Sequence, residues 1–235
     1  EYAESLSIDC ISTPFDESAV DLLEDIGTKF YKIASFEVTD LPLIRYIAKK
    51  QKPIIISSGM ADQSEIQEAL EVIRNEGVSD LVLLHCVSGY PTPIDQINLS
   101  TINLLRDTFN IEIGLSDHTL GNVSALMSMA YGVKVIEKHF TLSRADGGPD
   151  AAFSMEPDEL RSLSNDLKEG YLATGTPSFK RRSVEESNVK FRRSLYVIKD
   201  MKKGETFSED NIRRIRPGYG LSPKFFDDII GEISN

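Results

Sequence analysis

The first 170 residues of the chain alternate between short apolar, β-branched runs and longer polar stretches with helical periodicity. Runs that are apolar on both faces and separated by helices are typical of parallel strands covered by helices. The expected strands are Ser7–Ser12, Phe30–Ser35, Pro53–Ser57, Leu81–Val87, Ile111–Leu115 and Lys134–Phe140. The expected helices are Glu17–Ile26, Leu41–Lys50, Gln63–Glu76, Leu99–Thr108, Leu120–Tyr131 and Pro157–Gly170. The pattern therefore predicts six β/α units.

Polar side chains follow the end of each expected strand. They are Thr13; Lys32, Ser35 and Glu37; Ser57; Ser88 and Tyr90; Ser116 and His118; and His139. An open sheet binds its ligand at one switch point, whereas all the strand ends of a closed barrel face one mouth. These positions therefore favour a (β/α)8 TIM barrel in the α/β class. Because six units leave such a barrel open, we expect its first β/α units to lie in an N-terminal part outside this chain.

The balance of charge changes along the chain. Residues 1–175 carry 13 Lys and Arg against 28 Asp and Glu, whereas residues 176–235 carry 13 against 9. A break of this size predicts a domain boundary near Gly175. We expect a barrel domain over residues 1–172, a linker over 173–190 and a small β-rich domain over 191–235.

Bulk properties exclude several classes of protein. A net charge of −11 argues against nucleic acid as the main partner. No apolar run approaches the length of a membrane span, and no signal-peptide pattern opens the chain. Cys10 and Cys86 both lie in expected strands, where reduced core thiols are favoured over a disulfide. These features predict a cytoplasmic protein.

His118 and His139 end neighbouring expected strands. Two imidazoles in that position suit a divalent metal with open coordination positions for water and substrate. Two histidines with purely structural partners are the alternative. The third histidine, His85, lies in mid-strand and is expected to be structural.

Lys32 lies in an otherwise apolar strand, where burial of its charge costs several kcal/mol unless it is paired. It could pair with the phosphate or carboxylate of a ligand, or form a Schiff base as in a class I aldolase. The serines at neighbouring strand ends fit a cradle around a phosphorylated ligand better than an aldolase pocket. Each serine taken singly is more typical of a helix cap or a turn, and it is their recurrence at four strand ends that favours the cradle.

Two loops carry further candidates. The glycine-rich loop Arg144–Asp150 follows the His139 strand, and its Asp146 and Asp150 could accept hydrogen bonds from sugar hydroxyls. Arg216 lies in a stiff Arg-Pro-Gly-Tyr-Gly loop of the basic C-terminal part, where it could serve another domain's site or lie on the surface.

Several segments in fixed order resemble the successive strand ends of sialic acid synthases, the NeuB-like family. They are Ser12–Phe15, Tyr31–Ser35, Ile56–Met60, His85–Pro93, Gly114–Thr119 and Glu137–Phe140. The tail, with Lys202–Glu205 and Arg216–Gly220, is similar to the antifreeze-like (SAF) domain of that family, which we expect to be incomplete here. Within the family, Ser12–Val20, Ala145–Ser154 and Lys190–Tyr196 are most similar to pseudaminic acid synthases.

The resemblance implies an enzyme, a transferase that condenses phosphoenolpyruvate with an acylated amino sugar. It implies that phosphoenolpyruvate is held by Thr13, Lys32, Ser35, Ser57, Ser116 and Ser88, the last standing where some members have Asn. It implies a divalent metal, Mn²⁺ or Mg²⁺, on His118 and His139. The sugar ligands it implies are Tyr90, Asp150 and Arg216, with Glu37 near the reacting centre. It further implies a homodimer in which the SAF domain of one protomer completes the other's site.

The subfamily resemblance favours 2,4-diacetamido-2,4,6-trideoxy-L-altrose as the sugar. Synthases of N-acetylneuraminate or legionaminic acid, and spore-coat polysaccharide synthases, are alternatives within the family. A class I aldolase that uses Lys32 and a non-catalytic sugar-binding protein are alternatives outside it.

Overall fold

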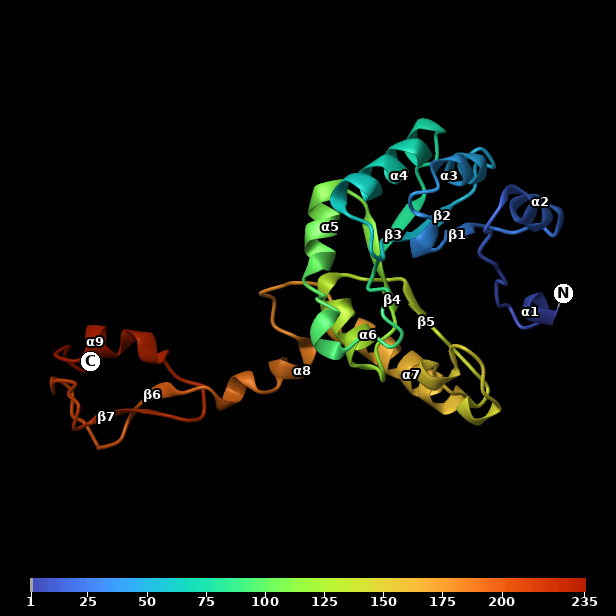
Figure 1. The fold of residues 1–235 in the computed structure, drawn as a ribbon. Coiled ribbons are helices and arrows are strands. Elements are labelled where there is room, and N and C mark those ends of the chain that lie inside the picture. The colour runs from blue at the N-terminus through green and yellow to red at the C-terminus, as the bar shows by residue number, and fades with distance from the viewer. Residues whose placement is uncertain (1) are drawn as a thin grey trace. The chain divides into compact units, whose positions relative to one another are not determined.

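The structure is a computed structural model that describes residues 2–235, which divide into two compact units after Gly175. The first unit alternates strands with helices (Figure 1). Its strands are β1 (Tyr31–Ile33), β2 (Ile54–Ser57), β3 (Leu81–Cys86), β4 (Glu112–Asp117) and β5 (Ile136–Lys138). Its helices are α1 (Tyr2–Ser5), α2 (Glu17–Asp25), α3 (Leu41–Ala48), α4 (Gln63–Asn75), α5 (Thr101–Phe109), α6 (Val123–Ser128) and α7 (Pro157–Thr174).

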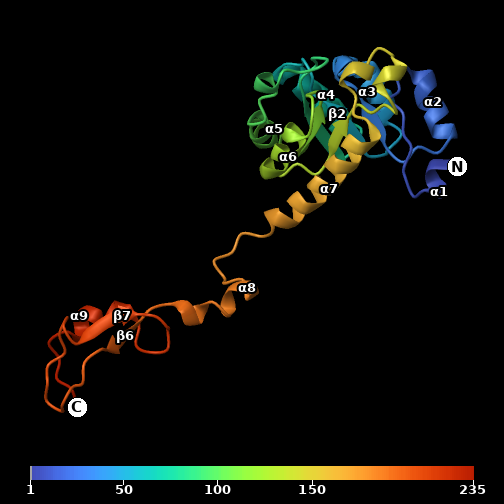
Figure 2. The same cartoon turned by 90° about the horizontal axis from the view of Figure 1, so that it is seen from below.

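The five strands form one parallel sheet in the order β1-β2-β3-β4-β5. The helices of this unit form an arc around the strands (Figure 2). Parallel neighbours in sequence order, each joined by a helix, are the repeating unit of the TIM barrel. The predicted parallel α/β class is therefore confirmed.

Side chains alternate between the two faces of the sheet along each strand. One set packs against the helices in the main hydrophobic core, including Tyr31 and Ile33 of β1, Ile56 of β2 and Leu83 of β3. The set between them, which begins with Lys32, faces the other side of the sheet. The main apolar core thus lies on the helix-facing side of the sheet. The opposite, concave side can carry polar side chains such as Lys32.

Local signals account for where the helices begin. Asp16 caps α2, because its Oδ1 accepts a hydrogen bond of 2.8 Å from the backbone N–H of Ala19. At α4, Asp62 and Glu65 form a reciprocal capping box. At α7, Glu156 closes a similar box and Pro157 occupies the first turn, where its missing N–H costs nothing.

The strand expected at Ser7–Ser12 is wrong. This segment has no regular structure, and Cys10 is exposed instead of lying in the core. An extended segment becomes a strand only where a neighbour takes up its backbone hydrogen bonds. Within residues 2–235, β1 pairs with β2 alone, so its other edge has no partner and the segment does not pair with it. The chain therefore forms five of the six expected strands.

Other boundaries differ less. The helix expected over Leu120–Tyr131 is divided into α6 and a 3-10 turn at Met129–Tyr131. The strand expected over Lys134–Phe140 is limited to β5, so His139 lies just after the strand.

The second unit contains an antiparallel pair, β6 (Ser194–Val197) with β7 (Ile212–Ile215), and the short helices α8 (Ser183–Glu186) and α9 (Phe226–Ile229). Isolated bridges join Leu195 to Leu221 and Thr206 to Ile233. Both strands lie within residues 191–235, where a small β-rich domain is expected. No helix among residues 2–235 combines the length and the apolarity needed to cross a membrane.

Gly114 in β4 provides a test of the packing on the concave side. A Cβ at this position would lie 2.3 Å from Leu84 Cδ2 and 2.7 Å from the Val135 carbonyl oxygen. We expect Gly114→Ala to lower the free energy of unfolding by about 1–3 kcal/mol in denaturant titrations, because neither neighbour is free to move. Gly170→Ala is the matched control, since its Cβ would meet the flexible end of Met129 in a helix that favours Ala. Equal effects of the two substitutions would contradict this account.

Candidate active site

Polar side chains gather on the concave side of the sheet because they share one alternation of the strands. Cys86, Ser116 and Glu137 lie side by side in register on β3, β4 and β5. Lys32 pairs in register with Ile55 of β2, and Ser57 lies two residues further along that strand, on the same face. Residues far apart in sequence therefore meet on one surface.

Lys32 is 7% exposed, so its ammonium group needs partners. Its Nζ donates a hydrogen bond of 2.9 Å to Ser57 Oγ and lies 3.3 Å from Glu137 Oε2. The other oxygen of Glu137 accepts a hydrogen bond of 2.6 Å from Ser116 Oγ. Two of the predicted phosphoenolpyruvate ligands, Lys32 and Ser116, thus contact a single carboxylate of the chain itself, and a third, Ser57, is joined to it through Lys32.

Sequence reasoning did not assign a role to Glu137. Its position was open to inference, because it shares the strand alternation of His139 and is charged in a short strand next to Ser116. The partner of Lys32 could not be read from sequence spacing, since Lys32 and Glu137 lie on strands that are not neighbours in the sheet.

A second serine pair lies beside this cluster. Ser35 begins the 3-10 turn after β1, and its Oγ lies 3.1 Å from Ser88 Oγ. Gly59 approaches both serines, since a Cβ there would lie 2.1 Å from Ser35 Cβ, and its φ of +51° also favours glycine. The backbone after β2 can therefore pass close to the two hydroxyls only because residue 59 lacks a side chain.

The two predicted metal ligands lie close together, with ring centroids 5.2 Å apart. His118 is buried, and its Nδ1 donates to the Val87 carbonyl oxygen at 3.0 Å, which leaves the lone pair on Nε2. Burial, together with the charge of His139, lowers the pKa of His118 and favours the neutral imidazole. Nδ1 of His139 lies 3.5 Å from Asp150 Oδ2.

This donor set fits a divalent metal. A carbonyl or carboxylate on Nδ1 that directs Nε2 toward a metal is the usual support for ligating histidines. Among residues 2–235 no group of three or more His, Cys, Asp or Glu side chains is arranged around one point. A metal held by these two imidazoles alone would take its remaining ligands from water or substrate oxygens.

Two aromatic rings border the histidines. The Tyr90 ring centroid lies 4.4 Å from that of His118 and 6.0 Å from that of His139. Phe153, which is 7% exposed, packs against His139 with centroids 5.0 Å apart and against Tyr90 at 5.7 Å. The imidazoles thus lie beside an apolar wall, of which Tyr90 is the accessible part.

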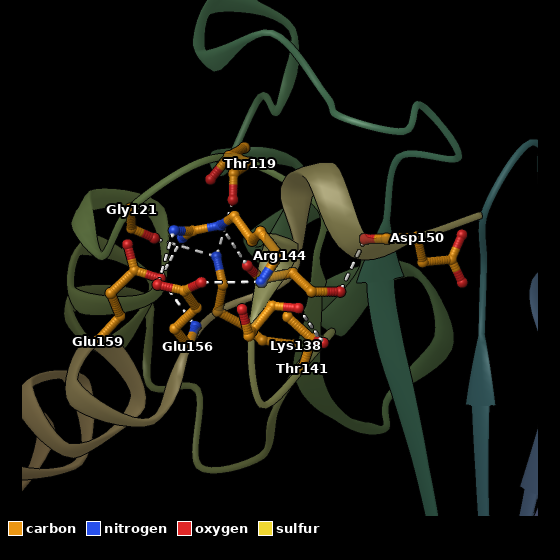
Figure 3. A network of polar contacts seen from close by, with 10 residues as sticks. Thr119, Gly121, Lys138, Thr141, Arg144, Asp150, Glu156 and Glu159 are labelled. Carbon is orange, nitrogen blue, oxygen red and sulfur yellow. Dashed lines mark hydrogen bonds and ion pairs between the residues drawn. The ribbon is translucent and has the colours of Figure 1, made fainter. Parts of the chain in front are cut away.

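A buried ion pair connects the strand ends that precede the histidines. Lys138 Nζ donates to Asp117 Oδ2 at 2.9 Å, with side chains 4% and 0% exposed. The same ammonium donates to the carbonyl oxygens of Thr119 at 2.9 Å and Gly121 at 3.0 Å (Figure 3). All three N–H bonds of the ammonium are used, so hydrogen bonds compensate for the loss of water around the buried charges. The pair also joins β4 to β5.

Three predicted ligands are not brought to this cluster by the contacts in the structure. Thr13 lies half-buried in the irregular segment before α2, and among residues 2–235 it makes no hydrogen bond to the other candidates. Asp146 is exposed in the loop after β5. Arg216 is exposed in the second unit, directly after β7.

Glu37 is the remaining carboxylate candidate. Its Oε2 is buried and has no hydrogen-bond partner in the described part of the chain. Burial, with a smaller effect of nearby Asp40, raises the pKa of the Glu37 carboxyl, and the charge of Lys32 only partly offsets this. A carboxyl with a raised pKa suits the transfer of protons near neutral pH.

Glu37 also predicts a dependence of stability on pH. A raised pKa in the folded state means that folded protein binds more protons than unfolded protein, so this group's contribution falls as pH rises. We expect Glu37→Gln to match the parent at pH values below the ordinary glutamate pKa of 4.5, where the carboxyl is protonated in both states, and to gain stability relative to it as the pH rises above that value. Chemical denaturation across these pH values measures the difference. A difference that shrinks as pH rises would contradict the assignment.

Several known proteins are similar to this chain in sequence and in fold. The sequence model of the NeuB family matches residues 1–178, and that of the SAF domain matches residues 192–235. A pseudaminic acid synthase from Helicobacter pylori is 42% identical over 234 residues, which cover 99% of this chain and 68% of that protein. An N,N'-diacetyllegionaminic acid synthase from Campylobacter jejuni is also 42% identical, over 99% of this chain and 71% of its own. A crystal structure of the N-acetylneuraminic acid (sialic acid) synthetase from Leptospira borgpetersenii has a TM-score of 0.75 at 32% identity, covering 80% of this chain and 65% of that one.

Proposed function

The chain belongs to the NeuB family, and from this premise we propose that it acts as a pseudaminic acid synthase. Family membership confirms the expected TIM-barrel fold with a SAF domain, and the named synthases among the relatives confirm the expected class of transferase. The relatives make it a sialic-acid-type synthase. The proposed reaction joins phosphoenolpyruvate to 2,4-diacetamido-2,4,6-trideoxy-L-altrose and releases phosphate.

One observation carries the proposal: a cluster of cation and hydroxyl donors lies on the same concave face as a pair of imidazoles. Lys32, Ser57 and Ser116 are joined by hydrogen bonds and an ion pair through Glu137. His118 comes directly after β4, two residues beyond Ser116, and its ring centroid lies 5.2 Å from that of His139, which comes directly after β5. The first group suits a phosphate and a carboxylate, and the second suits a metal beside a carbonyl oxygen.

The proposed chemistry forms one bond between carbons and breaks one C–O bond. Carbon 3 of phosphoenolpyruvate attacks the aldehyde carbon of the open-chain sugar, and water adds to carbon 2. The resulting intermediate loses phosphate to give the 2-keto acid. Lys32 and the serine hydroxyls hold the phosphate and carboxylate in a preorganised site, and Glu37 moves the protons. Bound Mn²⁺ or Mg²⁺, held by His118 and His139, would polarise the aldehyde oxygen.

The contacts of Lys32 favour this function over a class I aldolase. A Schiff base needs a neutral amine that is free to attack a carbonyl. The Nζ of Lys32 is instead already engaged, since it donates a hydrogen bond to Ser57 Oγ and lies 3.3 Å from Glu137 Oε2. A role in binding anionic groups is therefore the one that its surroundings support.

The proposal includes a homodimer in which Arg216 contacts the sugar bound by the other protomer. Arg216 supports this by its exposure, and the loop around it is held by the hydrogen bond from Gly218 N to the Lys190 carbonyl oxygen at 2.8 Å. A guanidinium on such a loop is available to a second molecule.

The sugar can be tested by measuring phosphate released from phosphoenolpyruvate by the full-length protein with Mn²⁺. We expect release with the diacetamido-trideoxy-altrose and little with N-acetylmannosamine, because an apolar wall at Tyr90 and Phe153 suits a sugar with few hydroxyls. Release with N-acetylmannosamine alone would overturn the proposed sugar. Release with none of the amino sugars, the legionaminic precursor included, would overturn the proposed reaction.

The metal ligands can be tested by substitution. We expect His118→Ala and His139→Ala each to lose bound metal, measured by mass spectrometry of the purified protein, and at least about 100-fold of activity. His85→Ala is the matched control: His85 is buried on the helix-facing side, where its Nε2 lies 2.6 Å from the Ile97 carbonyl oxygen. This control should be less stable but should keep its metal. Normal metal content in both test variants would rule out the assignment.

A further inference from the structure

The loop over residues 145–153 leaves the sheet after β5 and returns at the start of α7. Its two ends are joined by backbone hydrogen bonds from Met155 N to the His139 carbonyl oxygen at 2.8 Å, and from Thr141 N to the Met155 carbonyl oxygen at 2.9 Å. The tip contains Gly147 and Gly148, both at positive φ, and an added Cβ at either would meet nothing within 4 Å. Packing at the tip therefore does not hold the loop, and its order depends on its base.

Arg144 occupies that base with both its backbone and its side chain (Figure 3). Its N–H donates to Glu156 Oε1 at 2.8 Å, and its Nε donates to the Ser154 carbonyl oxygen at 3.0 Å. Its Nη1 lies 3.4 Å from Glu156 Oε2, and its Nη2 pairs with Glu159. One guanidinium thus connects the outgoing end of the loop, the returning end and the first turn of α7.

The loop carries side chains to the predicted metal ligand. Asp150 lies 3.5 Å from His139 Nδ1, and the Phe153 ring packs on that imidazole. Ser154 fixes the backbone between them, because its hydroxyl donates to the Asp150 carbonyl oxygen at 2.8 Å. The residue that Arg144 holds through its carbonyl oxygen is therefore the same residue that fixes Asp150.

We propose that Arg144 is a positioning residue for sugar recognition, which holds the loop over residues 145–153 so that Asp150 and Phe153 lie against His139. The proposal rests on the proposed function in one respect, namely that the ligand of this loop is the sugar. Arg144 does not touch the substrate itself. It acts through Ser154 and Asp150.

The exposure of these ion pairs distinguishes positioning from stabilisation. The side chains of Arg144, Glu156 and Glu159 are 36%, 37% and 46% exposed, and pairs this accessible contribute little to global stability. Their geometry is specific, however, because a planar guanidinium reaches two carboxylates and a carbonyl at once, which a lysine ammonium cannot do in the same arrangement. Loss of Arg144 should therefore release the loop while leaving the barrel folded.

The experiment compares Arg144→Met and Arg144→Lys with the parent in the full-length protein. Hydrogen–deuterium exchange should increase in peptides spanning residues 144–155 and stay unchanged in β3 and β4. The KM for the sugar should rise roughly 10- to 100-fold, because a misplaced loop loses the aligned contact. The KM for phosphoenolpyruvate should change less than about twofold, since none of its proposed ligands belongs to the loop. Arg144→Lys should be intermediate.

Arg161→Met is the matched control. Arg161 lies on α7, the helix that also carries Glu159. It pairs with Asp158 at the surface, with 69% of its side chain exposed. It should change neither exchange nor KM. Unchanged exchange over residues 144–155 in Arg144→Met would overturn the proposal, whatever the substrate. Equal increases in both KM values, or a fall in melting temperature as large as that of Gly114→Ala, would replace positioning by a general structural role. Increased exchange in the loop of Arg144→Met, with no catalysis by the parent, would support the role of Arg144 in holding the loop while rejecting the proposed reaction.

Discussion

The alternation of side chains along five parallel strands is the constraint on which the rest of the structure depends. Because each strand is covered by helices on one side, most residues that face that side are apolar, as Tyr31, Ile33 and Ile56 are. The residues between them face the other side of the sheet and need not be apolar. Lys32, Ser57, Ser116 and Glu137 can therefore be polar without weakening the core, and the strand register aligns them. The helix-facing core and the active site are thus two sides of one pattern.

Burial of charge is the second demand, and the chain meets it by pairing. Lys32 and Lys138 are both largely buried, and each has a carboxylate from a different strand, Glu137 for the first and Asp117 for the second. These pairs connect β1 to β5 and β4 to β5 at the end of the sheet where the ligands are proposed to lie. The electrostatic contacts that permit burial also hold the site together.

Much of the fold and of the site follows from sequence because both depend on local patterns. Short apolar, β-branched runs separated by helical stretches predict the five strands, and the polar residues at the ends of these runs predict the candidates that gather around Lys32 and His118. The rest depends on which strands are neighbours. The run at Ser7–Ser12 has the composition of a strand but does not pair with β1. Glu137 becomes the partner of Lys32 only because the curvature of the sheet brings β5 close to β1. Contacts between strands that are distant in the sheet have no signature in spacing along the chain.

The carboxylate of Glu137 gives the free protein a property that its cluster of donors does not suggest. Ser116 and Lys32 already hold one anion, supplied by the chain, so the pocket is close to electrically neutral before any ligand arrives. An incoming anion would enter by exchange, taking over contacts that Glu137 gives up, and not by filling an unmet positive charge. A small anion without a matching second group would gain little binding free energy from such an exchange. Such a pocket would favour a ligand with a matching second group over inorganic phosphate alone.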